Sequence, residues 1–199
     1  MEAQTLSEMD QVPIAETWAA MEYLVDYGLV KNIGVSNFSV GEITEIMALK
    51  ELKYAPQVNQ LELQPYFQRR DIAHYCQQRG LVVTAHTPLG GSANPWTDIH
   101  HQGKLLDDPV VSQIANEIGK TNAQVLLRWS LQKDFVVIPK SVNNDRLKSN
   151  FELYDFELTS DQINAIDLLD RGQRGCFNHP ATPWLGRSLF PDELEALSK

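Results

Sequence analysis

The positions of the large apolar residues predict a first helix over residues 14–25. They recur every three or four positions, at Ile14, Trp18, Met21, Leu24 and Val25. This is the spacing of one helix face, and Gly28 follows as a C-terminal stop. Similar periodicity predicts helices over residues 39–50, 69–79, 109–119, 122–131, 145–151 and 159–170. Three of them open with capping boxes, formed by Ser39 with Glu42, Thr121 with Gln124 and Thr159 with Gln162.

Short apolar segments between these helices predict four strands, over residues 33–36, 58–63, 81–85 and 135–138. A helix separates each strand from the next, and the chain carries no two-residue hairpin signal such as Asn-Gly. Strands connected in this way form a parallel sheet covered by helices. We therefore expect an α/β fold.

Each predicted strand carries polar residues toward its carboxyl end. Ser36 and Asn37 close the first strand, Asn59, Gln60 and Glu62 lie in the second, His86 and Thr87 follow the third, and Lys140 and Ser141 follow the fourth. In parallel sheets and barrels, ligands bind beyond the carboxyl ends of the strands. The four strands are expected to bring these residues to one rim.

Composition and charge narrow the function classes. The 199 residues include 43% apolar side chains and carry a formal net charge of -9, so a globular domain is expected and nucleic acid or an anionic membrane is a poor partner. Cys76 and Cys176 lie far apart, which suits a reducing, cytoplasmic location. The apolar runs are too short for a secretory signal or a membrane span.

Two candidate binding sites follow from the strand ends. Lys140, Ser141, Asn143 and Arg146 would bring two cations, a hydroxyl and backbone N–H groups to one point, which suits a phosphate. The alternative is a surface Lys and an Arg paired with Asp145. Residues 87–92 form a loop of small residues that could approach a diphosphate.

Asn37 and Gln60, if their strands are neighbours, could bind a planar carboxamide. On spacing alone, amides that close the turns at the strand ends are the more frequent arrangement. His86 could be an acid, a base or a stacking ring, and Trp96 could line a pocket or pack on the domain. No histidine lies in a metal-binding motif, and Ser36 lies in no nucleophile elbow. We expect neither a metal site nor a hydrolase.

Several segments resemble the aldo-keto reductases. They are residues 28–38 (GLVKNIGVSNF), 58–60 (VNQ), 84–91 (TAHTPLGG) and 137–141 (VIPKS). The resemblance covers residues 12–184, and the third segment, with residues 178–181 and Trp184, is most like the aldose-6-phosphate reductases of the sorbitol- and mannose-6-phosphate types. It implies a (β/α)8 barrel that binds NADP(H). Residues 1–199 would be about the C-terminal half, with residues 171–199 as a tail over the substrate pocket.

The resemblance also implies roles for individual residues. Ser36, Asn37 and Gln60 match positions that bind the nicotinamide carboxamide, and His86 replaces a stacking ring that is Tyr in most members. Thr87, Leu89 and Gly91 match the loop over the diphosphate. Lys140, Ser141, Asn143 and Arg146 match the site of the adenosine 2'-phosphate, and Asn150 matches an adenine contact. Trp96 and Asn178 match substrate-pocket positions.

The family's catalytic Asp, Tyr, Lys and His match no residue of this chain, so no catalytic residue is assigned. Four strands are also half of what the barrel requires, and such a barrel takes roughly 250 residues. The main interpretation is the cofactor-binding half of an NADP(H)-dependent reductase of aldoses or aldose phosphates. The alternatives are a non-catalytic NADP-binding or regulatory module, and an assembly in which a second chain completes the enzyme.

Overall fold

A computed structural model describes residues 12–91, 104–172 and 176. Its α-helices and strands follow one another in the predicted order. In chain order they are α1 (Ile14–Asp26), β1 (Val35–Ser36), α2 (Val40–Met47), β2 (Val58–Glu62), α3 (Arg70–Gln78), β3 (Val82–His86), the 3-10 helix η3 (Leu105–Asp107), α4 (Pro109–Ile118), α5 (Asn122–Gln132), β4 (Val136–Val137), α6 (Asn144–Ser149) and α7 (Ser160–Asp167).

The three predicted capping boxes are all present. At the start of α2, the Ser39 hydroxyl accepts from the Glu42 backbone N–H at 3.2 Å, and the Glu42 carboxylate accepts from the Ser39 N–H at 2.8 Å. The boxes at α5 and α7 have the same reciprocal pattern. Because each box satisfies helix N–H groups that have no partner within the helix, local sequence determines where these helices begin.

The four strands form one parallel sheet in the order β1-β2-β3-β4, which confirms the α/β class. Ser36 pairs with Gln60, and Glu62 pairs with His86. The outer strands β1 and β4 are two residues long, shorter than predicted. Each has a pairing neighbour on one side only.

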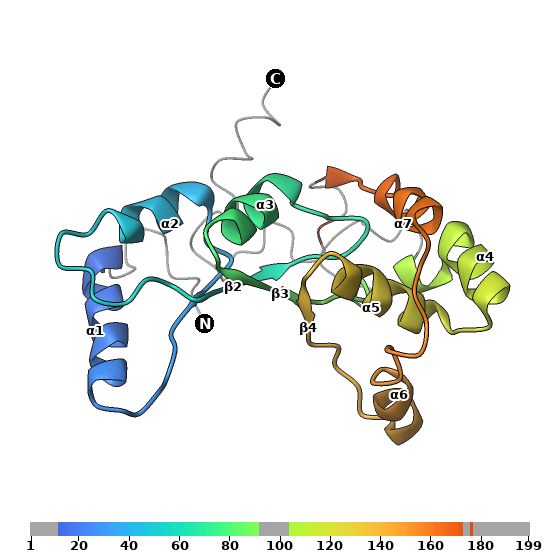
Figure 1. Cartoon of the computed structure of the whole chain (residues 1–199), viewed down its shortest axis with the longest axis horizontal. Coiled ribbons are helices and arrows are strands. Elements are labelled where there is room, and N and C mark those ends of the chain that lie inside the picture. The colour runs from blue at the N-terminus through green and yellow to red at the C-terminus, as the bar shows by residue number, and fades with distance from the viewer. Residues whose placement is uncertain (1–11, 92–103, 173–175, 177–199) are drawn as a thin grey trace, which may run out of the picture.

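One face of the sheet packs against helices. Leu61, Val83 and Ala85 point to this face and are fully buried, together with Ile43 of α2 and Trp129 of α5. Figure 1 shows α2 and α3 along the upper side of the sheet, whereas α1 and α6 lie below its level at the two ends. The main hydrophobic core therefore lies between the sheet and the helices on one side.

The opposite face keeps apolar side chains at the surface. Val82 and Val136 are each 45% exposed, and the register places them beside Val58 and Thr84. Val35, Val58, Val83 and Val137 could each have lined this open face. However, Val83 is buried in the main core and Val35 and Val137 pack against that core, so these three side chains point toward the helices.

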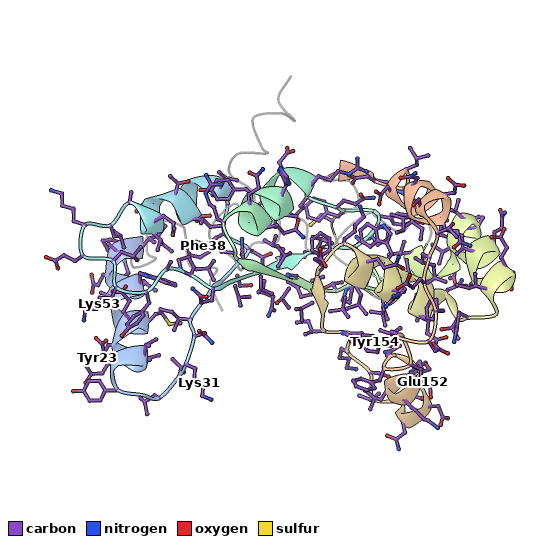
Figure 2. The ribbon with its side chains drawn as sticks, in the orientation of Figure 1. Tyr23, Lys31, Phe38, Lys53, Glu152 and Tyr154 are labelled. Carbon is purple, nitrogen blue, oxygen red and sulfur yellow. The ribbon has the colours of Figure 1, made fainter. Side chains whose placement is uncertain are left out.

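A second cluster attaches α1 to the sheet. Trp18 packs with Ile33 and Ile46, and Phe38 contacts both this cluster and the main core. The Glu22 carboxylate accepts from the backbone N–H groups of residues 53 and 54. Figure 2 shows Lys53 beside α1, where its ammonium donates to Asp26 at 2.7 Å and lowers the pKa of that carboxyl.

Within the described ranges, no helix combines the length and apolar character needed to cross a membrane.

The open strand edges of a partial barrel predict self-association of the purified chain, and the exposed valines of the sheet add to this expectation. Burial of apolar surface contributes about 25 cal/mol per Å², so species larger than the 22.5 kDa monomer should appear as concentration rises in sedimentation velocity experiments. The double variant Val82→Ser, Val136→Ser should move the distribution toward the monomer. Val142→Ser, which changes a residue 80% exposed outside the sheet, is the control. A wild-type monomer at every concentration would contradict this prediction.

Candidate functional site

The carboxyl ends of β1, β2 and β3 bring predicted site residues together. Ser36 and Asn37 end β1, Gln60 lies beside them in β2, and His86 and Thr87 end β3. The strands that carry Asn37 and Gln60 are thus neighbours, as the carboxamide hypothesis required.

The backbone carbonyl of Gln60 holds the end of β1. It accepts from the Asn37 backbone N–H at 2.8 Å and from the Ser36 hydroxyl at 3.0 Å. Asn37 has a positive φ of 57°, a conformation that Asn adopts more readily than most residues. These bonds turn the chain sharply and place the Asn37 side chain over the rim.

The side-chain amides of Asn37 and Gln60 differ in how far the protein uses them. Asn37 Oδ1 accepts from the Glu62 backbone N–H at 3.2 Å, so this oxygen does close a strand-end turn. In the described part of the chain, Asn37 Nδ2 and the Gln60 side-chain amide have no hydrogen-bond partner. The rim therefore offers amide groups to a ligand.

The half-buried ring of His86 contacts both Asn37 and Thr87. Its Nε2 lies 3.4 Å from Asn37 Oδ1, and its Nδ1 lies 3.0 Å from Thr87 Oγ1. Burial lowers the pKa of His86, the charge of Glu62 opposes this effect, and the charge of Arg69 adds to it. The ring is therefore mainly neutral at pH 7.

The loop after β3 has a tightly specified backbone. Thr87, Gly90 and Gly91 all have positive φ, and the Gly90 N–H donates to the Thr87 carbonyl at 2.9 Å. A Cβ on Gly90 would lie 2.8 Å from Leu105 Cβ, so glycine is required there for both conformation and space. Leu89 packs partly against the main core, which anchors the loop.

Two exposed cations follow β4: Lys140 lies between β4 and α6, and Arg146 lies in α6. Neither forms an ion pair with a described carboxylate, so the alternative pairing of Arg146 with Asp145 is absent here. Asn143 caps α6, because its Oδ1 accepts from the Arg146 backbone N–H at 2.9 Å. The Ser141 hydroxyl accepts from the Asn143 N–H.

Some predicted positions have other surroundings. Asn150 ends α6, where its backbone N–H donates to the Arg146 carbonyl at 2.9 Å. Trp96, Asn178 and almost all of the tail from residue 173 lie outside the described residues. Cys176 is buried beside Phe67, and its thiol donates to the Glu62 carboxylate at 3.4 Å. The chain thus returns to the carboxyl edge of the sheet after α7.

Asn59 does not belong to this rim. It is fully buried on the helix-covered face, where its Nδ2 donates to the Phe38 carbonyl at 3.0 Å. The prediction that the second strand delivers both Asn59 and Gln60 to the rim was wrong, because successive side chains of a strand point to opposite faces.

Two charged residues near the rim were assigned no functional role from the sequence. Glu62 is 1% exposed and Arg69 is 8% exposed, and both act on the pKa of His86. The alternation from Gln60 to Glu62 could have assigned the carboxylate to the rim side. Nothing in the local sequence predicts the burial of Arg69, which precedes α3 with a positive φ of 45°.

Tyr66 is occupied structurally. Its hydroxyl donates to Asp108 at 2.6 Å, and burial with this bond raises the pKa of Tyr66 to about 12. Among the residues that the structure covers, no group of His, Cys, Asp and Glu could hold a metal ion.

Comparison with known proteins agrees with the resemblance in sequence. A profile of the Aldo/keto reductase family matches residues 8–171. Aldo-keto reductase family 1 member A1-A of Danio rerio is 42% identical over 84% of this chain and 51% of its own length. The NADP-dependent D-sorbitol-6-phosphate dehydrogenase of Malus domestica is 39% identical over 87% of this chain and 54% of its own length. The chain spans about half the length of the curated relatives it matches.

The lowered pKa of His86 predicts a loss of stability in mild acid. Above the unfolded-state value of about 6.5, both states are neutral and His86 contributes nothing. As pH falls below that value the unfolded chain takes up the proton first, so the free energy of unfolding decreases. In urea unfolding at about pH 7 and about pH 5, His86→Gln should lose less stability than wild type.

The exposed His74 provides the control for this comparison, and His74→Gln should follow wild type. Equal acid sensitivity of His86→Gln and wild type would show that His86 does not account for the effect.

Proposed function

Because this chain belongs to the aldo/keto reductase family, we propose that it is the cofactor-binding part of an NADP(H)-dependent oxidoreductase that reduces an aldehyde to an alcohol. The observation that carries the proposal is a set of polar side-chain groups along one sheet edge that have no partner in the described part of the chain. Asn37 Nδ2, the Gln60 side-chain amide and the cations Lys140 and Arg146 have no hydrogen-bond or ion-pair partner among the described residues.

The groups present suit the nicotinamide end of the cofactor. Asn37 Nδ2 can donate to a carboxamide oxygen, and the Gln60 amide can donate or accept beside it. His86, neutral and half-buried, offers a ring face next to these amides. NADPH, when bound, supplies the hydride that reduces the carbonyl carbon.

The groups after β4 suit the 2'-phosphate of NADP(H). Lys140 and Arg146 are exposed cations, and an Arg guanidinium can bind phosphate in bidentate geometry. Ser141, Asn143 and Asn150 lie on the same short segment and would contact the phosphate and adenine. The loop of Thr87, Leu89 and Gly91 would cover the diphosphate.

We propose an aldose or aldose phosphate as the substrate. Support comes from the relative named for D-sorbitol-6-phosphate and from the third sequence segment. Trp96 and Asn178 would contact the substrate, and residues 171–199 would lie over its pocket. The buried position of Cys176 near the rim supports this path for the chain.

The cation pair predicts a preference for NADPH over NADH. A charge-assisted hydrogen bond contributes enough free energy to change affinity about tenfold or more, so removal of the 2'-phosphate should weaken binding on the order of tenfold to a thousandfold. Titration of the chain with both dinucleotides, followed by quenching of tryptophan fluorescence, measures the ratio.

Arg146→Ala should reduce this preference. Lys148→Ala is the matched control, because Lys148 is an exposed cation of the same helix that has no assigned role. Equal affinities for the two dinucleotides, or an unchanged preference in Arg146→Ala, would rule out the proposed phosphate site.

The purified chain should bind NADPH without reductase activity. The catalytic set implied by the family matches no residue in it, and a positioned acid alone is worth about a hundredfold to ten-thousandfold in rate. NADPH oxidation with glucose-6-phosphate, mannose-6-phosphate or xylose should not exceed the rate without protein, in samples shown to bind NADPH. Turnover comparable to that of an intact reductase would refute the assignment of catalysis to residues outside this chain.

A further inference from the structure

Four polar groups form a continuous chain across the ends of β1, β2 and β3. The Glu62 backbone N–H lies 3.2 Å from Asn37 Oδ1, and His86 Nε2 lies 3.4 Å from the same oxygen. His86 Nδ1 lies 3.0 Å from Thr87 Oγ1. The donor and acceptor roles of Asn37, His86 and Thr87 depend on one another.

One of these four groups can act only as a hydrogen-bond donor. A backbone N–H can only donate, so the Asn37 atom that faces Glu62 must be the carbonyl oxygen, and the amide nitrogen must point away. The His86 nitrogen that faces this oxygen must then carry a hydrogen. A neutral imidazole has one N–H, so Nδ1 is unprotonated and accepts from the Thr87 hydroxyl.

From this geometry we propose that His86 is a positioning residue, which holds the Asn37 carboxamide so that its Nδ2 faces a ligand as a donor. The proposal rests on the proposed function, because the ligand acceptor would be the carboxamide oxygen of the nicotinamide. Two donors then hold Asn37 Oδ1, and rotation of the amide would break both bonds.

The opposite tautomer would have a different effect. With the hydrogen on Nδ1, the lone pair of Nε2 would face Asn37 Oδ1, and the two acceptors would repel each other. The Thr87 hydroxyl can donate or accept, so it adapts to the ring and does not select the tautomer. Selection comes from the backbone of Glu62, through Asn37.

Protonation of His86 preserves the contact that matters. The added hydrogen goes to Nδ1, the Thr87 hydroxyl becomes the acceptor, and Nε2 still donates to Asn37. Among the described charged groups, Glu62 favours this protonation, and Arg69 opposes it. Asn37 is therefore held in both charge states of the ring.

The first test uses the chain without any dinucleotide. Long-range 1H–15N correlation spectra of the chain labelled with 15N-histidine report which ring nitrogen carries hydrogen, and the signals of His86 are those lost in His86→Phe. We expect Nε2–H in wild type and in Thr87→Val, since Thr87 only adapts. Observation of the Nδ1–H tautomer in wild type would overturn the proposal.

The second test separates positioning from general structure. His86→Phe keeps an aromatic ring and removes the donor, so affinity for NADP+ should fall about twofold to tenfold, the effect of one neutral hydrogen bond. Adenosine 2',5'-bisphosphate, which lacks the nicotinamide, should bind His86→Phe and wild type equally. His74→Phe, at an exposed histidine of α3 that has no assigned role, should bind both ligands as wild type does, within about twofold.

The possible results have distinct meanings. Equal weakening of NADP+ and the bisphosphate by His86→Phe, or no weakening of either, would overturn the positioning role. Failure of wild type to bind either ligand would instead refute the proposed function. The tautomer in the free chain would still decide whether His86 donates to Asn37.

Discussion

The parallel pairing of β1, β2 and β3 is the constraint on which the rim depends. Side chains alternate along a strand, so the register that sets Ser36 beside Gln60 and Glu62 beside His86 also assigns every neighbouring residue to a face. A slip of one residue would turn Gln60 toward the helices and bring Asn59 to the open side. The buried positions of Leu61, Val83 and Ala85 on the helix side oppose such a slip, because each would lose its place in the core.

The order of elements could be predicted because local signals determined it. The capping boxes of α2, α5 and α7 and the stop at Gly28 depend on residues a few positions apart, and all are present. The parallel sheet followed from the helix between each pair of strands. The short lengths of β1 and β4 could not be predicted in this way. They depend on the position of each strand in the sheet, and local sequence does not show that β1 and β4 are the outer strands.

The candidate site could be predicted in part. The position of a polar residue near a strand end showed that it lay close to the rim, but not which way it pointed. Asn59 and Gln60 are adjacent in sequence and face opposite sides, and a five-residue strand with polar residues on both faces does not show from its sequence which of them faces the helices. The hydrogen bonds that use Asn37 Oδ1 and leave its Nδ2 available join residues 25 and 49 positions apart. Such contacts have no local sequence signal.

The close approach of Gly90 to Leu105 couples two positions that the sequence separates. At 2.8 Å between the site of a Cβ and Leu105 Cβ, with φ of 74° at Gly90, the space beside the loop is already filled. Natural variation in this lineage should therefore treat the two sites as one unit. A larger residue at position 90 would need a smaller partner and a change of backbone together, so single substitutions there would be removed by selection while Leu105 persists.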